Sequence, residues 1–228
     1  MNKILITRPK KEAKILANQL ENIGYETVIE SLFSIKKESP KKFYKNPQAI
    51  IITSSNACSF LKKLNLAKNT LILTVGENTR NASMKLGFNN IISANNSATS
   101  LYNLALKTLS SKKGLIIYLS GEIITIDIAK KLEKKRFKAI RIIAYKTVRR
   151  IKLSNSLIDQ IKNNQINLAV IYSKETATTF YKLLLKHNLL EYFIKIKLLC
   201  LSKNIALYCK KLGFKKTELI FQIIKDND

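Results

Sequence analysis

The stretch AIIITSSNACSF, residues 49–60, begins as a continuous apolar run and then breaks into small hydroxyl and amide side chains. A short apolar run without alternation is typical of a strand that is buried on both faces of a parallel sheet. Apolar spacing resumes after the polar turn and continues to Leu64, which predicts a helix. A similar pattern returns in LAVIYSKETATTF, residues 168–180, at an offset of 119 residues when Thr53 is aligned with Tyr172 (172 − 53). The chain therefore repeats a unit of strand, polar turn and helix.

This unit recurs along the chain. Glycines such as Gly24 and Gly87 mark the expected ends of helices, and two longer runs, ETVIESLFSIKK (26–37) and FKAIRIIAYKTV (137–148), are expected to be extended. Further apolar strands are expected at residues 4–7, 69–75 and 114–120. Strands of this kind that alternate with amphipathic helices predict an α/β fold, with parallel sheets flanked by helices.

An internal match indicates two similar domains. VGENTRNASMKLGF (75–88) aligns without a gap with LSKNIALYCKKLGF (201–214), and both segments end in KLGF. The strand, polar turn and helix pattern is shared before those four identities. The polar, proline-containing segment 38–48 is the best linker candidate in the chain.

The composition limits the class of protein. The chain has 228 residues, of which 46% are hydrophobic, and it lacks an uninterrupted apolar run of about 18 residues, so no membrane span is expected. The start, MNKILITRPKK, has too short an apolar core for a signal peptide, which predicts a cytoplasmic protein. Cys58, Cys200 and Cys209 have no metal-ligand spacing and are expected to be small core residues.

The formal net charge of +26 has three interpretations. The excess is almost all lysine, spread through every segment beside many Asn and Ile residues, as an AT-rich coding sequence would produce. The charge could instead mark a nucleic-acid surface, or attract a polyanionic small molecule. We favour the first interpretation over a dedicated nucleic-acid surface.

Polar turns follow six of the predicted strands: TRP, TSSNA, VGENT, LSGE, YSKET and LSKN. In an open α/β sheet, ligands gather beyond the carboxyl ends of the strands. Small hydroxyl side chains in these turns can cap the helices that follow, and the helix N-termini can also bind anions through free N–H groups. Both interpretations stay open for a single turn. Six such turns together predict a site with many carboxylate anchors.

Sharper catalytic motifs are absent from the sequence. It has no Gly-rich dinucleotide fingerprint and no phosphate-loop signature. The only histidine, His187, lies at helical spacing from Phe180 and Leu184, which indicates a helix flank, and zinc binding is disfavoured. Glu122 and Asp127 are the only argument for paired-carboxylate hydrolysis. A conventional enzyme with a nucleophile and a base is therefore disfavoured.

Taken together, these motifs resemble the uroporphyrinogen-III synthase family over nearly the whole chain. The resemblance rests on the order of ILITRP, TSSNA, VGENT with Gly87 downstream, SATSLYNLA, LSGE, AYKTV, and the second set YS…LSKN…LGF. It implies two α/β domains joined by a pair of extended strands, with residues 1–37 and 146–228 in one domain and 38–145 in the other. The joining strands would be 26–37 and 137–148.

The resemblance also implies an activity. The family cyclises hydroxymethylbilane, a chain of four pyrroles with acetate and propionate groups, to uroporphyrinogen III, with inversion of ring D and loss of water. The reaction takes place in an interdomain cleft and is implied to need no cofactor and no metal. Because uncatalysed closure gives the symmetrical isomer, the main task of the protein is to orient the substrate.

Site residues follow from the matching motifs. Tyr145 in AYKTV matches the interdomain tyrosine of the family, which could donate a hydrogen bond or a proton to the departing hydroxyl; packing at a strand end is the alternative role. Candidate substrate-binding residues are Thr7, Arg8, Ser54, Ser55, Asn56, Gly76, Thr79, Ser100, Ser120, Gly121, Ser173, Lys174 and Ser202.

The sequence departs from the family pattern at some positions. Ser202 stands where glycine is usual, Lys174 and Glu175 replace small residues or proline, and the tail 215–228 is short. The expected partner is the small-molecule substrate, with room for a transient contact with the preceding pathway enzyme. We expect a monomer that binds no membrane, and nucleic acid is disfavoured. The alternative is a non-catalytic two-domain α/β protein that binds a polyanion such as nucleic acid.

Overall fold

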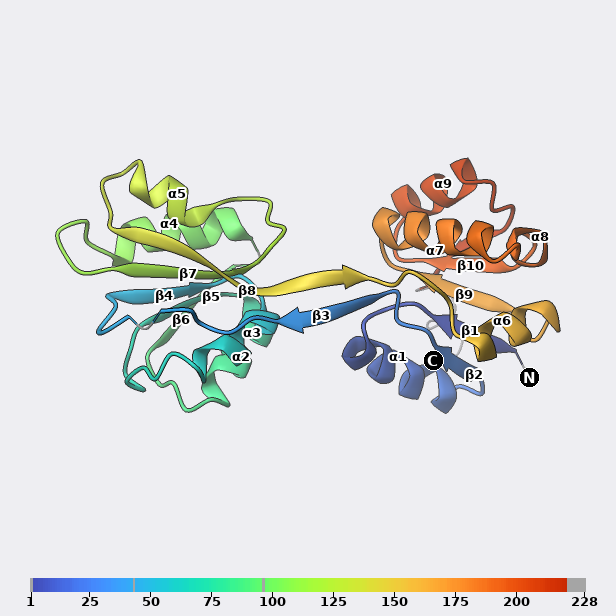
Figure 1. Ribbon diagram of the computed structural model, residues 1–228, viewed down its shortest axis with the longest axis horizontal. Helices are drawn as coiled ribbons and strands as arrows, with labels where there is room; N and C mark the ends of the chain where they lie inside the picture. The colour runs from blue at the N-terminus through green and yellow to red at the C-terminus, as the bar shows by residue number, and fades with distance from the viewer. Residues whose placement is uncertain (1, 43, 96, 221–228) are drawn as a thin grey trace. The chain divides into compact units, whose positions relative to one another are not determined.

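The computed structural model describes residues 2–42, 44–95 and 97–220 of the chain. The described residues divide into two compact units: those up to Ser34 together with those from Val148 onward form one, and those within Ile35–Thr147 form the other. The chain passes between the units in the strands β3 (Phe33–Lys37) and β8 (Ala139–Arg149) (Figure 1). The domain boundaries predicted from the sequence fall after β3 and inside β8, and they stay a prediction.

The first unit is a five-stranded parallel sheet with the strand order β11-β10-β9-β1-β2. Its strands are β1 (Lys3–Ile6), β2 (Glu26–Ile29), β9 (Leu168–Ile171), β10 (Lys197–Cys200) and β11 (Thr217–Leu219). Its helices are α1 (Lys10–Asn22), α6 (Asn155–Lys162), α7 (Lys174–Lys186), α8 (Leu190–Phe193) and α9 (Lys203–Lys211). Helices cover both faces of the sheet (Figure 1).

Apolar side chains on alternate positions of each strand fill two cores in this unit. Ile4 and Ile6 of β1 pack with α1 residues such as Leu20, whereas Leu5 packs on the opposite face with residues such as Phe180 of α7. Successive side chains of a strand point to opposite faces, so a strand that is covered on both sides must be apolar throughout. This is the physical reason for the uninterrupted apolar runs.

The second unit is a six-stranded sheet with the strand order β3-β8-β7-β4-β5-β6, in which the pairs from β8 to β6 are parallel. Its other strands are β4 (Ala49–Ile52), β5 (Ile72–Val75), β6 (Ile91–Ala94) and β7 (Ile116–Gly121). Its helices are α2 (Ser55–Leu61), α3 (Gly76–Met84), α4 (Ala98–Thr108) and α5 (Ile128–Glu133). Ile50 and Ile52 face one core, and Ile51 faces the other.

The predicted fold class is confirmed: two similar α/β units with parallel sheets and flanking helices are joined by two extended strands. The prediction of a single extended strand over residues 26–37 is wrong in detail, because these residues form two strands, β2 and β3. The break contains Glu30, whose buried carboxylate accepts hydrogen bonds from Ser154 and pairs with Arg150. The tail 215–228, for which the sequence supports no structural prediction, contains β11, and residues 221–228 lie outside the described residues.

The three cysteines are free and buried, as predicted. Burial raises the pKa of the Cys58 thiol, which disfavours the reactive thiolate. We expect none of the three thiols to react rapidly with Ellman's reagent in the native protein, and all three to react after denaturation in guanidinium chloride. Rapid modification of any one of them in the native state would contradict this packing.

Within the described part of the chain, none of the helices combines the length and the apolar character that spanning a bilayer demands.

Candidate functional site

The polar turns gather at one edge of each sheet. In the first unit, the neighbouring strands β10, β9 and β1 are parallel, so the turns that follow them lie at the same edge. In the second unit, β7, β4 and β5 are neighbours in the same way. Each unit therefore brings three of the six predicted turns together at the carboxyl ends of its strands, where ligands of open α/β sheets bind.

At the edge of the first unit, two cations lie over aromatic rings. The guanidinium carbon of Arg8 is 4.0 Å from the centre of the Tyr172 ring, and the ammonium group of Lys174 is 5.7 Å from that of Tyr208. Such contacts hold a cation in place without neutralising its charge. Arg8 and Lys174 therefore keep positive charge beside the strand ends, where a carboxylate could pair with it.

The serines that precede the helices act as N-caps. Ser173 accepts a hydrogen bond from the backbone N–H of Thr176 (3.0 Å) and Ser202 from that of Ile205 (3.4 Å). Ser54 accepts from the N–H of Asn56 (3.3 Å) in the second unit. A cap satisfies only one of the four free N–H groups of a helix N-terminus, so capping and anion binding are compatible at the same turn.

Three of the predicted site residues have buried side chains. The hydroxyl of Thr7 donates to the carbonyl of Val170 (2.7 Å) and the residue has no exposed surface. Thr79 is buried in the first turns of α3, and Ser120 is fully buried. Ser120 also lies inside β7, with Gly121, rather than in a turn as the LSGE motif had suggested. A contact between one of these turns and a substrate would therefore use the backbone, and the place of the three residues in the site stays a prediction.

Four other candidates lie at helix starts in the second unit. Ser55 and Asn56 begin α2 and are partly exposed. Gly76 begins α3 with φ +69°, a left-handed conformation that favours glycine. Ser100, in the first turn of α4, has its hydroxyl 2.8 Å from that of the N-cap residue Ser97. All four lie beyond strand ends of the same sheet.

Tyr145 lies against the end of β7, next to Gly121. The β8 strand pairs Ile143 with Ser120 and Tyr145 with Gly121, so that Ala144 is an extra residue in β8, a β-bulge. The backbone N–H of Glu122 donates to the carbonyl of Tyr145 (3.0 Å). The Tyr145 hydroxyl makes no hydrogen bond with any residue that the structure describes, so it stays free to act on a ligand.

Sequence reasoning missed two residues at this edge. Arg141 donates to the Ser120 hydroxyl and to the carbonyls of Gly121 and Glu122. The Tyr118 hydroxyl lies 3.4 Å from that of Thr53, and burial raises the pKa of Tyr118. An arginine within an otherwise apolar strand, as in AIRIIAY, is the signal that could have pointed to Arg141.

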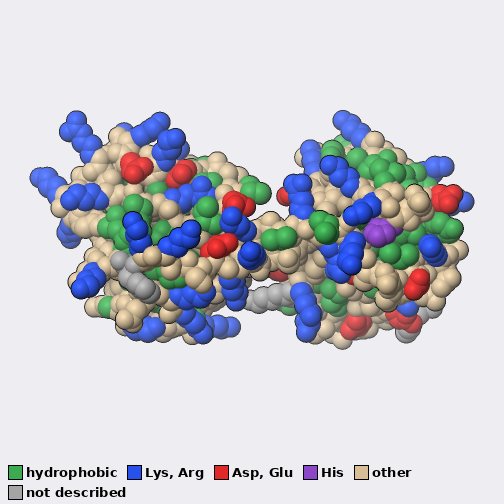
Figure 2. Space-filling model, viewed as in Figure 1, with side chains coloured by type: hydrophobic (Ala, Val, Ile, Leu, Met, Phe, Trp, Pro, Cys, Tyr) green, Lys and Arg blue, Asp and Glu red, His purple; other side chains and the backbone are tan. Residues whose placement is uncertain are grey.

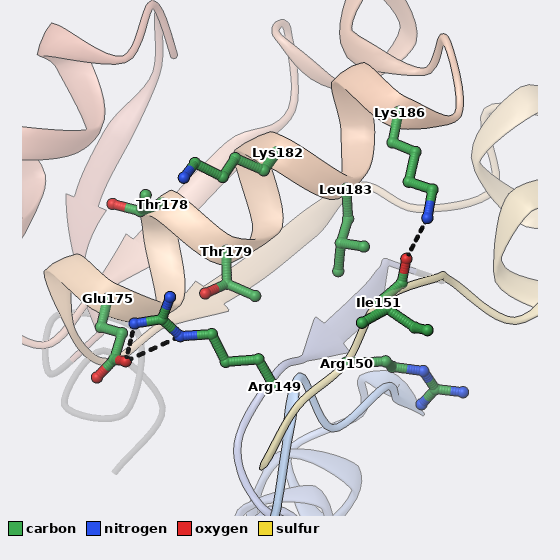
Figure 3. A pocket seen from close by; sticks show the side chains of 9 residues that line it. All are labelled: Arg149, Arg150, Ile151, Glu175, Thr178, Thr179, Lys182, Leu183 and Lys186. Carbon is green, nitrogen blue, oxygen red and sulfur yellow. Dashed lines mark hydrogen bonds and ion pairs between the residues drawn. The ribbon is translucent and has the colours of Figure 1, made fainter. Parts of the chain in front are cut away.

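A basic groove of about 600 Å³ runs beside α7 in the first unit (Figure 3). Two of the four cations that line it form ion pairs within the unit: Arg149 pairs with Glu175 (2.7 Å) and Arg150 with Glu30 (3.3 Å). Lys186 donates a hydrogen bond to the carbonyl of Ile151 (2.8 Å) and keeps its charge. Lys182 is the lining cation without a partner among the described residues. The groove therefore offers an anion less free charge than its composition suggests.

On the visible face of the molecule, Lys and Arg side chains are scattered over both units and form no single stripe (Figure 2). A nucleic-acid surface would concentrate them on one face or along one element.

Among the described residues, 2–42, 44–95 and 97–220, no group of three or more potential metal ligands is found.

A comparison with protein-family models identifies the chain. The model described as Uroporphyrinogen-III synthase HemD matches residues 14–218. The chain belongs to the uroporphyrinogen-III synthase family. This family serves porphyrin and haem biosynthesis. A comparison with curated proteins found no match.

Solved structures of uroporphyrinogen-III synthases have the same fold. The enzyme from Helicobacter pylori 26695 is 15% identical with a TM-score of 0.58, and the match covers 99% of this chain and 97% of that one. A mutant uroporphyrinogen III synthase from the extremely thermophilic bacterium Thermus thermophilus is 12% identical with a TM-score of 0.55, and the match covers 100% and 98% of the two chains. At these identities the likeness shows the fold alone.

The departure at Ser202 from the usual family pattern has a simple structural account. Its φ of −151° is extended, so the backbone does not require glycine here, and the hydroxyl caps α9. The other departure, Lys174 with Glu175, places one charge of each sign at the start of α7 in this member of the uroporphyrinogen-III synthase family.

Proposed function

We propose that this member of the family is a uroporphyrinogen-III synthase that cyclises hydroxymethylbilane to uroporphyrinogen III, with inversion of ring D and loss of water. The observation that supports it most strongly is the gathering of polar strand-end turns at one edge of each sheet in a chain of this family. The interdomain cleft that the family resemblance implies, between residues 1–37 with 146–228 and residues 38–145, is part of the proposal.

Substrate binding would rely on many weak anchors. The acetate and propionate groups of the substrate are carboxylates, and helix N-termini bind anions through free N–H groups and positive potential. Capped helix starts at Ser54, Ser173 and Ser202, and the cations Arg8 and Lys174, supply such anchors. Backbone N–H groups are not nucleophiles, so they can hold a reactive intermediate without being alkylated by it.

The reaction itself would need orientation and one proton donor. Loss of the terminal hydroxyl as water leaves a delocalised cation, which the substituted carbon of ring D attacks to give a spiro intermediate. Fragmentation and reclosure then give the inverted ring. Tyr145 would donate a hydrogen bond or a proton to the departing hydroxyl. Holding the chain folded so that this closure outruns the direct one accounts for the remaining selectivity.

The rest of the proposal concerns the setting of the reaction. We propose a lyase that acts without a cofactor, as a monomer in the cytoplasm. A transient contact with the enzyme that produces hydroxymethylbilane would limit uncatalysed closure of this unstable substrate. These statements rest on membership of the family.

An isomer-resolved assay tests the function. The purified protein is mixed with freshly generated hydroxymethylbilane, and the oxidised products are separated by chromatography. We expect mainly the type III isomer, formed faster than the type I isomer appears in buffer. If only the type I isomer forms, at the rate seen without protein, the chain is not an active synthase. A serum albumin control corrects for non-specific binding of the substrate.

A further inference from the structure

We propose that Gly121 and Arg141 are positioning residues for Tyr145, and that the bulge at Ala144 aims its ring. This inference rests on the proposed function for its catalytic meaning, and it reassigns Gly121 from a substrate contact to a support for the tyrosine. Three separate structural observations lead to it.

The first observation is the direction of the Tyr145 side chain. In a regular strand, residues 144 and 145 would point to opposite faces of the sheet. Here Ala144 and Tyr145 both pack against the core cluster that includes Ile52 and Leu119. The register shift between Ser120 and Gly121 supplies the extra residue that turns Tyr145 to this face. Bulges next to active sites commonly redirect a side chain in this way.

The second observation is the contact between Gly121 and the tyrosine ring. A Cβ atom at Gly121 would lie 2.8 Å from Cζ of Tyr145 and 2.9 Å from both its Cε2 and its hydroxyl oxygen. These distances are too short for any side chain, so the ring lies directly on the glycine backbone. The φ of Gly121 is not among the positive values of the described residues, so the backbone itself would accept alanine. The glycine is required by the ring and not by the strand.

The third observation is the way in which Arg141 holds this backbone. Its Nε donates to the Ser120 hydroxyl (2.8 Å), and its Nη2 donates to the carbonyls of Gly121 (2.8 Å) and Glu122 (2.7 Å). The planar guanidinium thus fixes three consecutive residues, including the glycine under the ring. A lysine has no such fork and could not make the same set of bonds.

These contacts define how the tyrosine is placed. Arg141 fixes the end of β7, Gly121 provides a flat support, and the bulge turns the ring onto it. The hydroxyl is left without a hydrogen-bond partner among the described residues. A catalytic group that is misplaced by about 1 Å can lose about 100-fold in rate. Positioning of the ring should therefore matter nearly as much as the hydroxyl itself.

A double-mutant cycle tests the proposal. Gly121→Ala should lower kcat for the type III isomer by about 100-fold with little change in KM, and Arg141→Lys should lower it by a smaller factor. In the Tyr145→Phe background, each change should lower kcat by a further factor of less than about three, because both changes act through the hydroxyl that Tyr145→Phe removes. Gly114→Ala is the matched control in the same unit, where a Cβ would meet nothing nearer than 3.7 Å.

A readout without substrate accompanies the kinetics. In protein labelled with 3-fluorotyrosine, the fluorine resonance of Tyr145 is assigned by its loss in Tyr145→Phe. We expect Gly121→Ala and Arg141→Lys to shift this resonance, and Gly114→Ala to leave it unchanged. Thermal unfolding verifies that each variant is folded. If Gly121→Ala does not fold, Arg141→Lys alone tests the proposal.

The outcomes separate the two proposals. An unchanged Tyr145 resonance in Gly121→Ala, or equal losses of rate with and without the Tyr145 hydroxyl, overturns the positioning role. If the wild-type protein forms no type III isomer, the proposed function fails, and the fluorine resonance still decides whether Gly121 and Arg141 place the ring.

Discussion

Replacing Glu30 with alanine is expected to lower the free energy of unfolding of the first unit by about 3 kcal/mol. Only 5% of the surface of Glu30 is exposed. Its carboxylate accepts hydrogen bonds from the backbone N–H of Ser154 (2.8 Å) and from the Ser154 hydroxyl (3.0 Å), and it lies 3.3 Å from Nε of Arg150. Removing the carboxylate leaves the N–H and the hydroxyl of Ser154 without this acceptor, and unpaired polar groups away from water are costly. Arg150 loses its ion-pair partner but keeps the hydrogen bond from Nε to the carbonyl of Lys152 (2.9 Å).

The position of this carboxylate explains why the effect should be large. Glu30 lies in the break between β2 and β3, whereas Ser154 is the N-cap residue of α6, so one side chain joins two distant parts of the chain. The hydroxyl of Ser154 also caps α6 by accepting from the N–H of Leu157 (3.3 Å). Loss of Glu30 should therefore loosen the helix start as well as the break.

Hydrogen exchange measured by mass spectrometry in increasing urea provides the measurement. Peptides from β1 and β9 should lose protection at lower urea in Glu30→Ala, and peptides from the second unit serve as an internal reference. Glu26→Ala is the matched control, because this carboxylate is half exposed and pairs with Lys3 at 3.2 Å. An exposed pair of this kind contributes less than about 1 kcal/mol. Equal losses of protection in the two variants would show that the buried Glu30 contributes no more to the free energy of unfolding than an exposed ion pair does.

Glu30 also shows which features of the fold could not be predicted from the sequence. The parallel strands were predictable because each is a local apolar run, and the turns were predictable because hydroxyl residues follow those runs directly. The break at Glu30 depends on Ser154, 124 residues away along the chain. A single glutamate in an extended run gives no sign that a distant backbone N–H will bury it, so residues 26–37 were predicted as one strand.

In the candidate site, too, local features were predictable from the sequence, whereas features that depend on distant residues were not. The serines at the helix starts were predictable from their place after a strand, and the structure shows them as caps. Burial of Thr7 and Ser120 was not predictable, because their hydrogen-bond partners, Val170 and Arg141, belong to other strands. The bulge at Ala144 is a feature of strand register, which the apolar pattern of β8 alone does not contain.

Replacing Tyr145 with phenylalanine is expected to slow formation of the type III isomer by about 100-fold, within the range for loss of a general acid. The hydroxyl has no hydrogen-bond partner among the described residues, so its removal breaks no internal bond. The ring keeps its packing against the core of the second unit and against Gly121. Stability should therefore be nearly unchanged while the rate falls.

The ratio of isomers gives a second and more specific readout of Tyr145→Phe. Under the proposed function, slower loss of the terminal hydroxyl on the protein leaves more substrate to close in solution, so the type I fraction should rise as the type III rate falls. Tyr44→Phe is the matched control, because Tyr44 packs against the same core cluster in the same unit and has no role in the proposed reaction. Unchanged rate and isomer ratio in Tyr145→Phe would remove this hydroxyl from the mechanism. Orientation by the strand-end turns would then have to account for the whole of the selectivity, because those turns do not depend on the hydroxyl.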